Sequence, residues 1–490
     1  MSDTSKEVPP GDPNSSATIV VGRSRFEPPT HPGTSARYIS GPASRRYRLW
    51  YTLSYLSIMI VWGALLSIIL PNHVQLIEIK NWFTGADAGV NLQHLSQLAQ
   101  SVHSGHAHPT ADQHRLLGLL TDYNASKAQA LSIISSIGVF ITMLIQPIIG
   151  ILSDRTRSRM GRRAPWILYG SLVGALFLVL SSFATSLAIL AVLFTLAQVV
   201  INIAQNPLMA TVADRVRESE RGAISGLGGL AQFIGGVIGA AGAGFAFAYI
   251  GLGLYYVIAI VVVFFCGMFV LISRDRSSRD LVTAPLQWKE FFAGYTRALR
   301  SWNFRWVWIA RMLVLFGFSV STALSLYMMQ SYVQPALSQT EASQIVPLLS
   351  LSGIPLALVA VVIAGMLSDR LQRRVIFIVI ASIIMSLSLL IPLFSPTLPG
   401  LFLSTIVAYF AFGIYLPVDQ ALFIDVLPDP SAAGRDLGVA GIATNLGQTL
   451  GPLVAGAVVT ITGAYGGVWV VGFILVALAS VAVLPLRGIR

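Results

Sequence analysis

The sequence predicts an all-α membrane protein in which twelve transmembrane helices form two pseudo-symmetric six-helix bundles. First, 54% of the 490 residues are hydrophobic and only 11% are charged, too little charge to cover a soluble protein of this length. Second, apolar stretches of roughly 18 residues or more recur, and each can cross a ~30 Å hydrocarbon core as a helix. Third, motifs of the first half recur in order in the second. The mean hydropathy of the chain is +0.72, and the excess apolar surface is therefore expected to face lipid.

The spanning helices are predicted from these apolar stretches and from the Gly, Pro and charged residues that bound them. An even number of helices places both ends of the chain on the same side of the membrane. The predicted helices cover residues 48–71, 128–152, 164–184, 187–211, 222–248, 252–273, 304–330, 345–367, 375–394, 400–424, 436–462 and 466–486.

These helices divide the chain into four parts. Residues 1–47 are rich in Pro, Gly, Ser and Thr and contain no apolar run long enough for a signal-peptide core, so a disordered cytoplasmic tail is expected there. An N-terminal bundle over 48–273, with a long outer loop at 73–127, is expected to precede a basic cytoplasmic connector at 274–303. A C-terminal bundle is expected over 304–490.

The distribution of positive charge predicts the orientation. All but four of the 32 Lys and Arg residues lie in the tail, the connector, the C-terminus and the loops predicted to share their side. Short loops rich in Lys and Arg stay in the cytoplasm, so we expect a multi-pass protein of the inner or plasma membrane with both termini cytoplasmic. The net charge of +11 is then explained by topology and anionic lipid rather than by a nucleic-acid partner. The four exceptions are Lys80, Arg115, Lys127 and Arg311.

The two halves of the chain resemble each other. Residues 150–155, GILSDR, are echoed at an offset of 215 by residues 365–370, GMLSDR, and Asp214 is echoed by Asp425. Glycines are common in membrane helices, but a series that keeps its order and nearly one offset indicates duplication of a six-helix unit, a usual architecture of transporters. The glycines that repeat at an offset of 212 are Gly222, Gly226, Gly235 and Gly239 with Gly434, Gly438, Gly447 and Gly451.

The loop between the second and third predicted helices reads GILSDRTRSRMGRRAPW over residues 150–166. It resembles the signature loop of the major facilitator superfamily, and residues 365–374 resemble the second copy of that loop. The long form of the loop and the segment YLPVDQALFIDVLP at 415–428 resemble the branch of sucrose carriers and glycoside–pentoside–hexuronide cation symporters. The chain departs from the pattern at Ala164, where many members have arginine, and in its longer first outer loop.

The resemblance implies a monomer that moves a small-molecule solute by alternating access, with helices 1, 4, 7 and 10 around a central cavity. It also implies that the loop residues and their second copies gate the cytoplasmic side. The other interpretation, orientation and folding through the positive charges alone, stays open. The predicted gate residues are Gly150, Asp154, Arg155, Gly161, Arg162, Asp214, Gly365, Asp369, Arg370 and Asp425.

Two ionisable residues, Arg311 and Asp419, fall well inside predicted helices. Counted from the cytoplasmic ends of their helices, they lie at similar depths, ~10 Å and ~8 Å. A charge inside a membrane costs ~2.5–3.5 kcal/mol and usually has a partner, so we predict an ion pair in the C-terminal half. Asp419 would either take up and release a proton or hold the helices in a static pair. No buried carboxylate is expected in helices 1, 2 or 4, which favours proton over sodium coupling.

Amide and aromatic side chains recur on the predicted cavity helices. Amides both donate and accept hydrogen bonds and suit hydroxyl groups, while aromatic faces suit the apolar faces of a sugar. A neutral sugar or glycoside is therefore expected as the solute; the alternatives are a proton-coupled exporter of drugs or metabolites and a carrier of monoanions. Any single amide can instead join two helices, and Trp62 can serve packing alone. The candidate solute-binding residues are Tyr55, Trp62, Asn202, Gln205, Asn206, Gln232, Tyr327, Gln330, Tyr415, Asn445 and Gln448.

The predicted outer loop holds every histidine except His31. If folded together, His103, His106, His108 and His114 could bind a borderline divalent metal; otherwise they belong to a cap that titrates near pH ~6.5. We predict no metal and no cofactor. Neither a phosphate-binding GxxxxGK[ST] loop nor an HExxH motif occurs, so an enzyme is not expected.

Overall fold

The computed structural model describes residues 41–279, 298–371, 373–428 and 433–487; the side chain of Asp369 lies outside the described part. Most of the predicted tail and the middle of the predicted connector also lie outside it. Residues 41–47, predicted as tail, belong instead to the first helix, which begins at Gly41.

In the N-terminal half, the first spanning helix is far longer than predicted. It runs from residue 41 to residue 82, with one π-helical turn at Leu65–Ile69. The second spanning helix begins at residue 111 rather than 128 and extends beyond its apolar part. The helices of this half are α1 (Gly41–Ala64), α2 (Leu70–Trp82), α3 (Leu92–His103), α4 (Ala111–Arg155), α5 (Ala164–Ser181), α6 (Leu187–Arg215), α7 (Glu218–Ile250) and α8 (Leu254–Ile272).

In the C-terminal half, two predicted helices are interrupted. The predicted helix 304–330 is split at Ala323 and Leu324 into two parts, and the predicted helix 375–394 has a short separate last turn. The helices of this half are α10 (Trp302–Thr322), α11 (Ser325–Ser331), α12 (Gln339–Leu371), α13 (Arg374–Ser388), α14 (Ile391–Phe394), α15 (Leu398–Asp425), α16 (Ala433–Thr462) and α17 (Gly466–Ala482).

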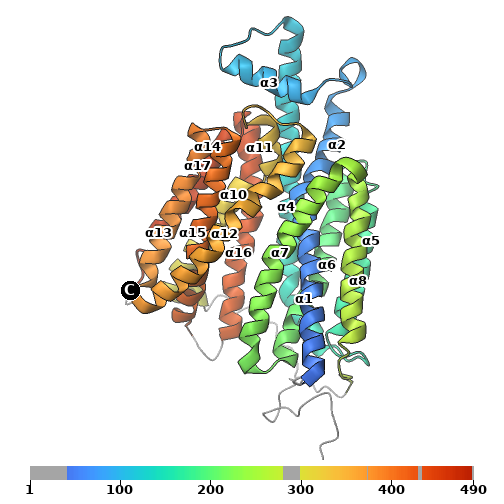
Figure 1. Cartoon of the computed structure of the whole chain (residues 1–490), viewed down its shortest axis with the longest axis vertical. Helices are drawn as coiled ribbons and strands as arrows, with labels where there is room; N and C mark the ends of the chain where they lie inside the picture. The colour runs from blue at the N-terminus through green and yellow to red at the C-terminus, as the bar shows by residue number, and fades with distance from the viewer. Residues whose placement is uncertain (1–40, 280–297, 372, 429–432, 488–490) are drawn as a thin grey trace, which may run out of the picture.

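Helix packing repeats between the halves. In the first half α1 packs against α7 and α8, and α6 packs against α4 and α5; in the second half α10 packs against α16 and α17, and α15 packs against α12 and α13. Ten described segments are long and apolar enough to span a membrane; one of them contains both α7 and α8, and the shorter α17 is also apolar. These helices and their duplicated packing confirm the predicted fold class (Figure 1).

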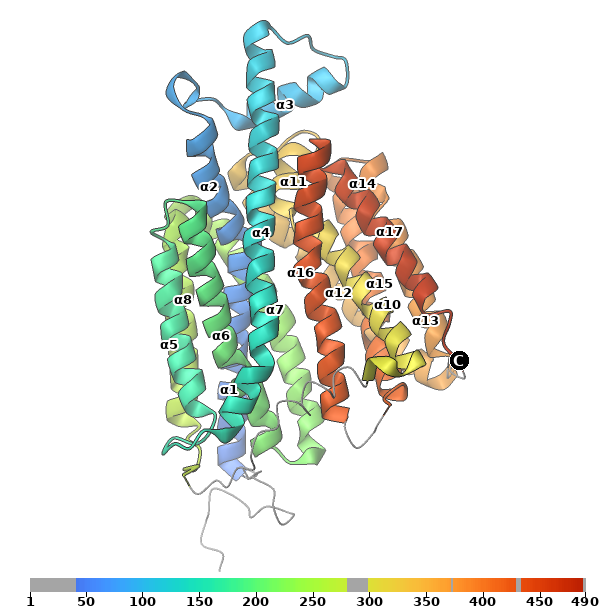
Figure 2. The same ribbon diagram turned by 180° about the vertical axis from the view of Figure 1, so that it is seen from behind.

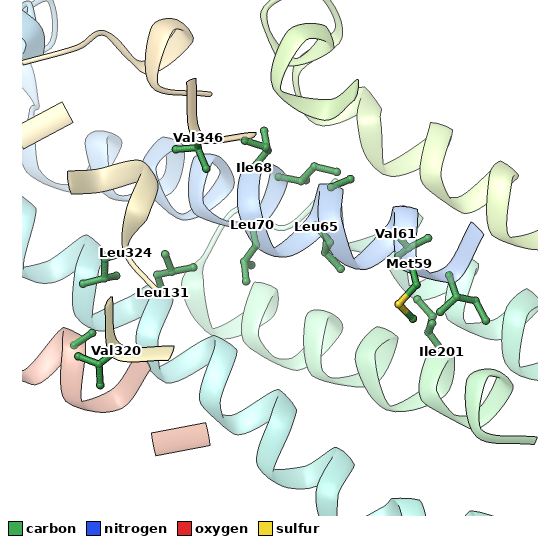
Figure 3. Packing of buried hydrophobic residues seen from close by; sticks show 14 of the residues in the cluster. Met59, Val61, Leu65, Ile68, Leu70, Leu131, Ile201, Val320, Leu324 and Val346 are labelled. Carbon is green, nitrogen blue, oxygen red and sulfur yellow. The ribbon is translucent and has the colours of Figure 1, made fainter. Parts of the chain in front are cut away.

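The halves meet along two helix pairs, α4 with α16 and α7 with α12. Glycines allow this approach: a Cβ at Gly244 on α7 would overlap the carbonyl oxygen of Ser343 on α12. On the other pair, a Cβ at Gly456 would lie 2.5 Å from Ser132 Oγ. Buried apolar side chains continue across the contact, and the close view in Figure 3 includes Leu131 of one half and Leu324 of the other.

The two ends of the molecule differ. At one end, here called the capped end, α2, α3 and the start of α4 rise above the other helices (Figure 1). The opposite end, here called the basic end, carries the start of α1 and the loop 156–163 between α4 and α5. Figure 2 shows α4 and α16 diverging toward the basic end. A Cβ at Gly150 or Gly441, both nearer that end of these helices, would meet no atom within 4 Å.

The outer loop forms a small domain. Leu95 of α3 packs with Leu120 and Tyr123 of α4 and with Phe83 in a separate apolar cluster. Asn91 caps α3 by accepting hydrogen bonds from the backbone of Gln93 and His94. Hydropathy alone missed this domain because its apolar residues are spaced for one helix face rather than for a membrane span.

Candidate solute and coupling site

The buried charges of the C-terminal half form an ion pair. Arg311 on α10 donates from Nε to Asp419 Oδ2 on α15 over 2.8 Å and also contacts the same oxygen through a terminal nitrogen. Only 7% of the arginine side chain and 4% of the aspartate side chain are exposed. The pair therefore neutralises two charges that would each be costly if buried alone.

Neighbouring side chains complete the surroundings of the pair. Tyr415, one turn before Asp419, donates its hydroxyl to Asp419 Oδ1 over 2.9 Å. The ring of Phe423, one turn after it, lies 3.9 Å from the guanidinium carbon of Arg311. Each carboxylate oxygen thus accepts at least one hydrogen bond, and a proton on Asp419 would weaken the charge-assisted bonds from Arg311.

Amides connect the middle of the two halves. Gln146 on α4 donates to Asn202 Oδ1 on α6 over 3.4 Å and accepts from Asn445 Nδ2 on α16 over 3.3 Å. Trp62 on α1 donates from its indole to Gln205 Oε1 on α6 over 2.9 Å. Sequence reasoning missed Gln146, although a glutamine directly before Pro147 inside an apolar helix is a visible signal.

The remaining solute candidates fall into two groups. Tyr55 is buried and its ring stacks on that of Tyr51 with centroids 6.2 Å apart, while Asn206 is half-buried and Gln232 and Gln448 are exposed. Tyr327 and Gln330 lie on α11 at the capped end, and the Tyr327 hydroxyl donates to the carbonyl of Pro71 over 2.8 Å. The structure therefore does not bring these two together with the central amides.

At the basic end of the N-terminal half, Arg163 joins two carboxylates. It contacts Asp154 at the end of α4, donates from Nε to Asp214 Oδ2 on α6 over 2.9 Å, and donates to Ser153 Oγ over 2.6 Å. Arg162 also binds Asp214, through Nε over 3.1 Å and through a terminal nitrogen. Sequence reasoning named Arg162 and missed Arg163, because the order of residues in a loop does not show which guanidinium turns inward.

Glycine is required in the same loop. Gly161 has a φ of +94°, a conformation that side chains disfavour, and a Cβ there would lie 2.6 Å from Asp275 Cβ. Among the other gate candidates of this loop, Arg155 is half-buried and Gly150 faces open space.

The C-terminal half repeats the arginine–aspartate contact. Arg374 donates to Asp425 Oδ2 over 2.5 Å, and both residues lie 211 positions after Arg163 and Asp214. This copy is more exposed, with 41% of the Asp425 side chain accessible. Gly365 and Arg370 lie near the end of α12, and Asp369 between them falls outside the described side chains.

The small domain formed by the end of α2, by α3 and by the start of α4, here called the cap, holds the two halves together. It does so through glutamines on one face of α3. Gln97 donates to the carbonyl of Ala336 over 3.2 Å, and Gln100 donates to that of Val333 over 2.8 Å, both in the loop between α11 and α12. Next to them, Asn72 of α2 donates to Ser343 Oγ over 3.1 Å and accepts from Gln339 over 2.7 Å. The hydrogen bonds between the halves thus concentrate at the capped end.

The histidines of the predicted outer loop do not converge. His73 is buried in α2, where its ring nitrogens contact the Tyr255 hydroxyl and the carbonyl of Ala184. His106 bonds to the neighbouring Ser104. Within the described residues, no group of three or more His, Cys, Asp or Glu side chains could hold a metal ion.

Two buried charges at the capped end were not predicted. Glu78 on α2 is 3% exposed and accepts hydrogen bonds from Asn81, Trp82 and Ser126. Lys127 on α4 is 2% exposed. The expectation of no buried carboxylate in helix 1 was wrong, because that helix continues past residue 71 to residue 82 and buries its last turns against α4.

The family follows from a comparison with known proteins. The sequence model of a family described as "MFS/sugar transport protein" matches residues 117–483, which is most of the chain. The chain belongs to this family. Its members are transporters rather than enzymes, and the duplicated helix packing described above is the architecture of a multi-pass membrane transporter.

Shorter matches link the chain to individual proteins. It is 48% identical over 62 residues to an uncharacterized symporter of Synechocystis sp., covering 13% of this chain and 11% of that protein. It is 32% identical over 159 residues to the general alpha-glucoside permease of Schizosaccharomyces pombe, covering 29% of this chain and 27% of that protein. The matched regions thus span less than a third of either relative.

Solved structures share the fold at low identity. A D-xylose-proton symporter matches with a TM-score of 0.62 at 14% identity, over 90% of this chain and 98% of that one. An inward-facing, unoccupied bacterial homolog of the human lysosomal transporter Spinster matches with a TM-score of 0.58 at 13% identity, over 91% and 95%. At such identities the likeness concerns the fold alone.

Proposed function

We propose that the protein moves a small neutral polar solute, a sugar or glycoside, across the cell membrane by proton-coupled alternating access, as a monomer with both termini in the cytoplasm. The observation that carries the proposal is the buried Arg311–Asp419 pair, which joins two helices predicted to line the solute path. The basic end is then cytoplasmic, in keeping with its arginines.

The pair supports a simple coupling step. When Asp419 binds a proton, its attraction to Arg311 falls and the guanidinium is free to turn to another acceptor, such as a solute hydroxyl. When the proton leaves, the charged pair re-forms. Arg311 lies on α10, and Asp419 with Tyr415 lies on α15, so breaking and re-forming the pair changes the contact between these helices. Their movement would then open or close the solute path.

The amides support a polyhydroxylated solute. Gln146, Asn202 and Asn445 come from both halves and hold one another over 3.3 to 3.4 Å, lengths at which a solute hydroxyl can compete. A solute that replaces these bonds would contact both halves at once, as alternating access requires. The resemblance to an alpha-glucoside permease agrees with this solute class.

The carrier of monoanions and the exporter are weaker candidates. Among the described residues, Arg311 is the central cation that could bind an anion, and Asp419 already holds it. Nothing in the contacts of the described residues favours an export direction over import.

Reconstituted protein tests the proposal. Proteoliposomes should accumulate a radiolabelled alpha-glucoside or xylose when a proton gradient is imposed, and collapse of the gradient should leave only equilibration. Asp419→Asn is expected to abolish accumulation while retaining exchange of solute across the membrane. The proposal of proton coupling fails if Asp419→Asn and Arg311→Gln both accumulate solute normally.

A further inference from the structure

We propose that the capped end contains an oxyanion-binding site, distinct from the central amides and from the Arg311–Asp419 pair, in which Lys127 binds a carboxylate or a phosphate. The site is a cavity of about 330 Å³ below α3, with Gln75, Tyr123, Asn124, Lys127, Gln330 and Gln339 among its lining residues. This volume lies at the lower end of the range for small-ligand sites.

Lys127 is a buried lysine that lacks an anionic partner. In the described part of the chain no carboxylate lies within 4.0 Å of its nitrogen. Its contacts are the ring faces of Tyr123 and Tyr327, 4.6 Å and 4.8 Å from its nitrogen to the ring centroids. Such contacts stabilise an ammonium group but do not neutralise it, and a buried unpaired charge is costly.

The nearby Glu78 carboxylate does not serve as the counter-ion of Lys127. Glu78 is occupied by donors from Asn81, Trp82 and Ser126, and it is not part of the cavity lining. The cavity lining contains no Asp or Glu, and the nearby carboxylates of Glu78 and Glu341 lie behind it and accept hydrogen bonds from other donors.

Further polar atoms at the cavity lack protein partners. Gln330 Nε2 is buried and makes no hydrogen bond. The Tyr123 hydroxyl and the Gln75 side-chain oxygen are buried and face each other, and neither makes a hydrogen bond of good geometry. The Gln330 amide and the Tyr123 hydroxyl can each donate a hydrogen bond to an oxyanion that lies beside the Lys127 ammonium group. The Gln75 side chain can also donate if its amide is flipped so that the nitrogen faces the cavity. Buried donors without partners are rare in folded proteins and here coincide with the unpaired cation.

The lining comes from both halves. Gln75 and Lys127 belong to α2 and α4, whereas Gln330 and Gln339 belong to α11 and α12. A bound oxyanion would therefore join the halves and stabilise the closed capped end. This consequence rests on the proposed transport function; the binding itself does not.

Thermal unfolding of the purified full chain in detergent tests the site. Sodium phosphate and sodium acetate are titrated separately at pH 7.5 and constant ionic strength, with sodium chloride as the balancing salt. We expect a saturable rise in Tm of a few degrees with at least one of them. A response to phosphate alone identifies a free phosphate site, and a response to acetate alone identifies a site for carboxylate solutes.

Two variants make the test specific. Lys127→Met keeps the length of the side chain and should abolish the response while raising Tm in the absence of oxyanion, since it removes an unpaired buried charge. The control Lys80→Met, which removes an exposed lysine near the same end, should respond like the wild type. If Lys127→Met does not fold, Gln330→Leu provides the measurement and should weaken binding about fivefold.

The proposed site would be excluded if oxyanion raised the Tm of the wild type and of Lys127→Met equally. It would also be excluded if neither oxyanion gave a saturable rise in the Tm of the wild type. Either result is independent of sugar uptake. Loss of uptake in Asp419→Asn alongside a missing oxyanion response would leave the transport proposal intact and remove only the site.

Discussion

Arg163 and Asp214 are related to Arg374 and Asp425 by one offset of 211 residues, and each arginine donates to its aspartate, over 2.9 Å in the first half and 2.5 Å in the second. The duplicated sequence thus places corresponding arginine–aspartate pairs at the basic end of the two halves. The first copy is enclosed and the second is partly exposed.

This difference predicts unequal effects of matched substitutions. Arg163→Gln should lower the free energy of unfolding by about 1–3 kcal/mol, because Asp154 and the buried Ser153 lose their arginine donor and Asp214 keeps only Arg162. Arg374→Gln should cost at most about 1 kcal/mol, because its partner is solvated. Denaturant titration of both variants in detergent measures the difference, and equal losses would show that enclosure of the first pair has no energetic effect.

The buried pair in the C-terminal half should show non-additivity. Arg311→Met alone should destabilise the protein by about 3–5 kcal/mol, since it leaves the Asp419 carboxylate buried without a counter-charge. The double variant Arg311→Met/Asp419→Leu should recover much of this loss, because no charge remains to be desolvated. A double variant as unstable as the sum of the single variants would argue against direct coupling of the two residues.

The central amides should affect solute affinity rather than folding. Gln146→Leu removes the side chain that connects Asn202 and Asn445, and each lost hydrogen bond to a solute costs roughly 1 kcal/mol, about fivefold in Kd. Equilibrium binding of a solute that the reconstituted protein accumulates gives the measurement. Gln113→Leu, on the same helix but in its exposed first turn, serves as control and should bind like the wild type.

Closure of the capped end depends on a glycine contact. Gly456→Ala places a methyl group against Ser132 of the other half, so the halves must separate there, at a cost of about 1–3 kcal/mol. Hydrogen–deuterium exchange in α3 and in residues 332–338 should therefore accelerate.

The matched change Gly441→Ala on the same helix meets no atom within 4 Å and should leave this exchange unchanged. Its effect on stability should even be favourable, because alanine is the better helix former by about 1 kcal/mol. Slower or unchanged exchange in Gly456→Ala would contradict the role of the contact.

The cap should loosen in acid. Arg115 binds Asp87 with two parallel hydrogen bonds of 2.7 and 2.8 Å, and these bonds lower the pKa of Asp87 below its ordinary value of 3.8. Because the depressed pKa belongs to the folded state, the stabilisation is complete above pH 3.8 and is lost as the pH falls through the folded-state value.

Limited proteolysis of residues 84–115 with an acid-active protease can follow this loss. Cleavage in the wild type should rise modestly below pH 3.8, and Arg115→Gln should remove this rise, because an exposed ion pair contributes little beside the apolar cluster of this domain. A wild type and an Arg115→Gln variant with the same dependence on pH would exclude the ion pair as a source of acid sensitivity.

The sequence by itself determined the number of spanning helices, the duplication and the nature of the basic loops. These properties follow from local features: a membrane core demands long apolar stretches, and a repeated motif keeps its order whatever the packing. The depth of Arg311 and Asp419 also followed from counting along two helices, and the structure places them in contact.

Only the tertiary structure decided which polar groups meet. Arg163 reaches Asp214 together with Arg162 and also contacts Asp154, Gln146 joins the central amides, and Tyr327 with Gln330 faces the capped end instead of the middle. The buried Glu78 and Lys127 were missed because helices α2 and α4 continue beyond their apolar parts and are covered by α3 and the other half. Hydropathy measures the preference of a segment for lipid, whereas burial against other helices depends on contacts between residues far apart in the chain.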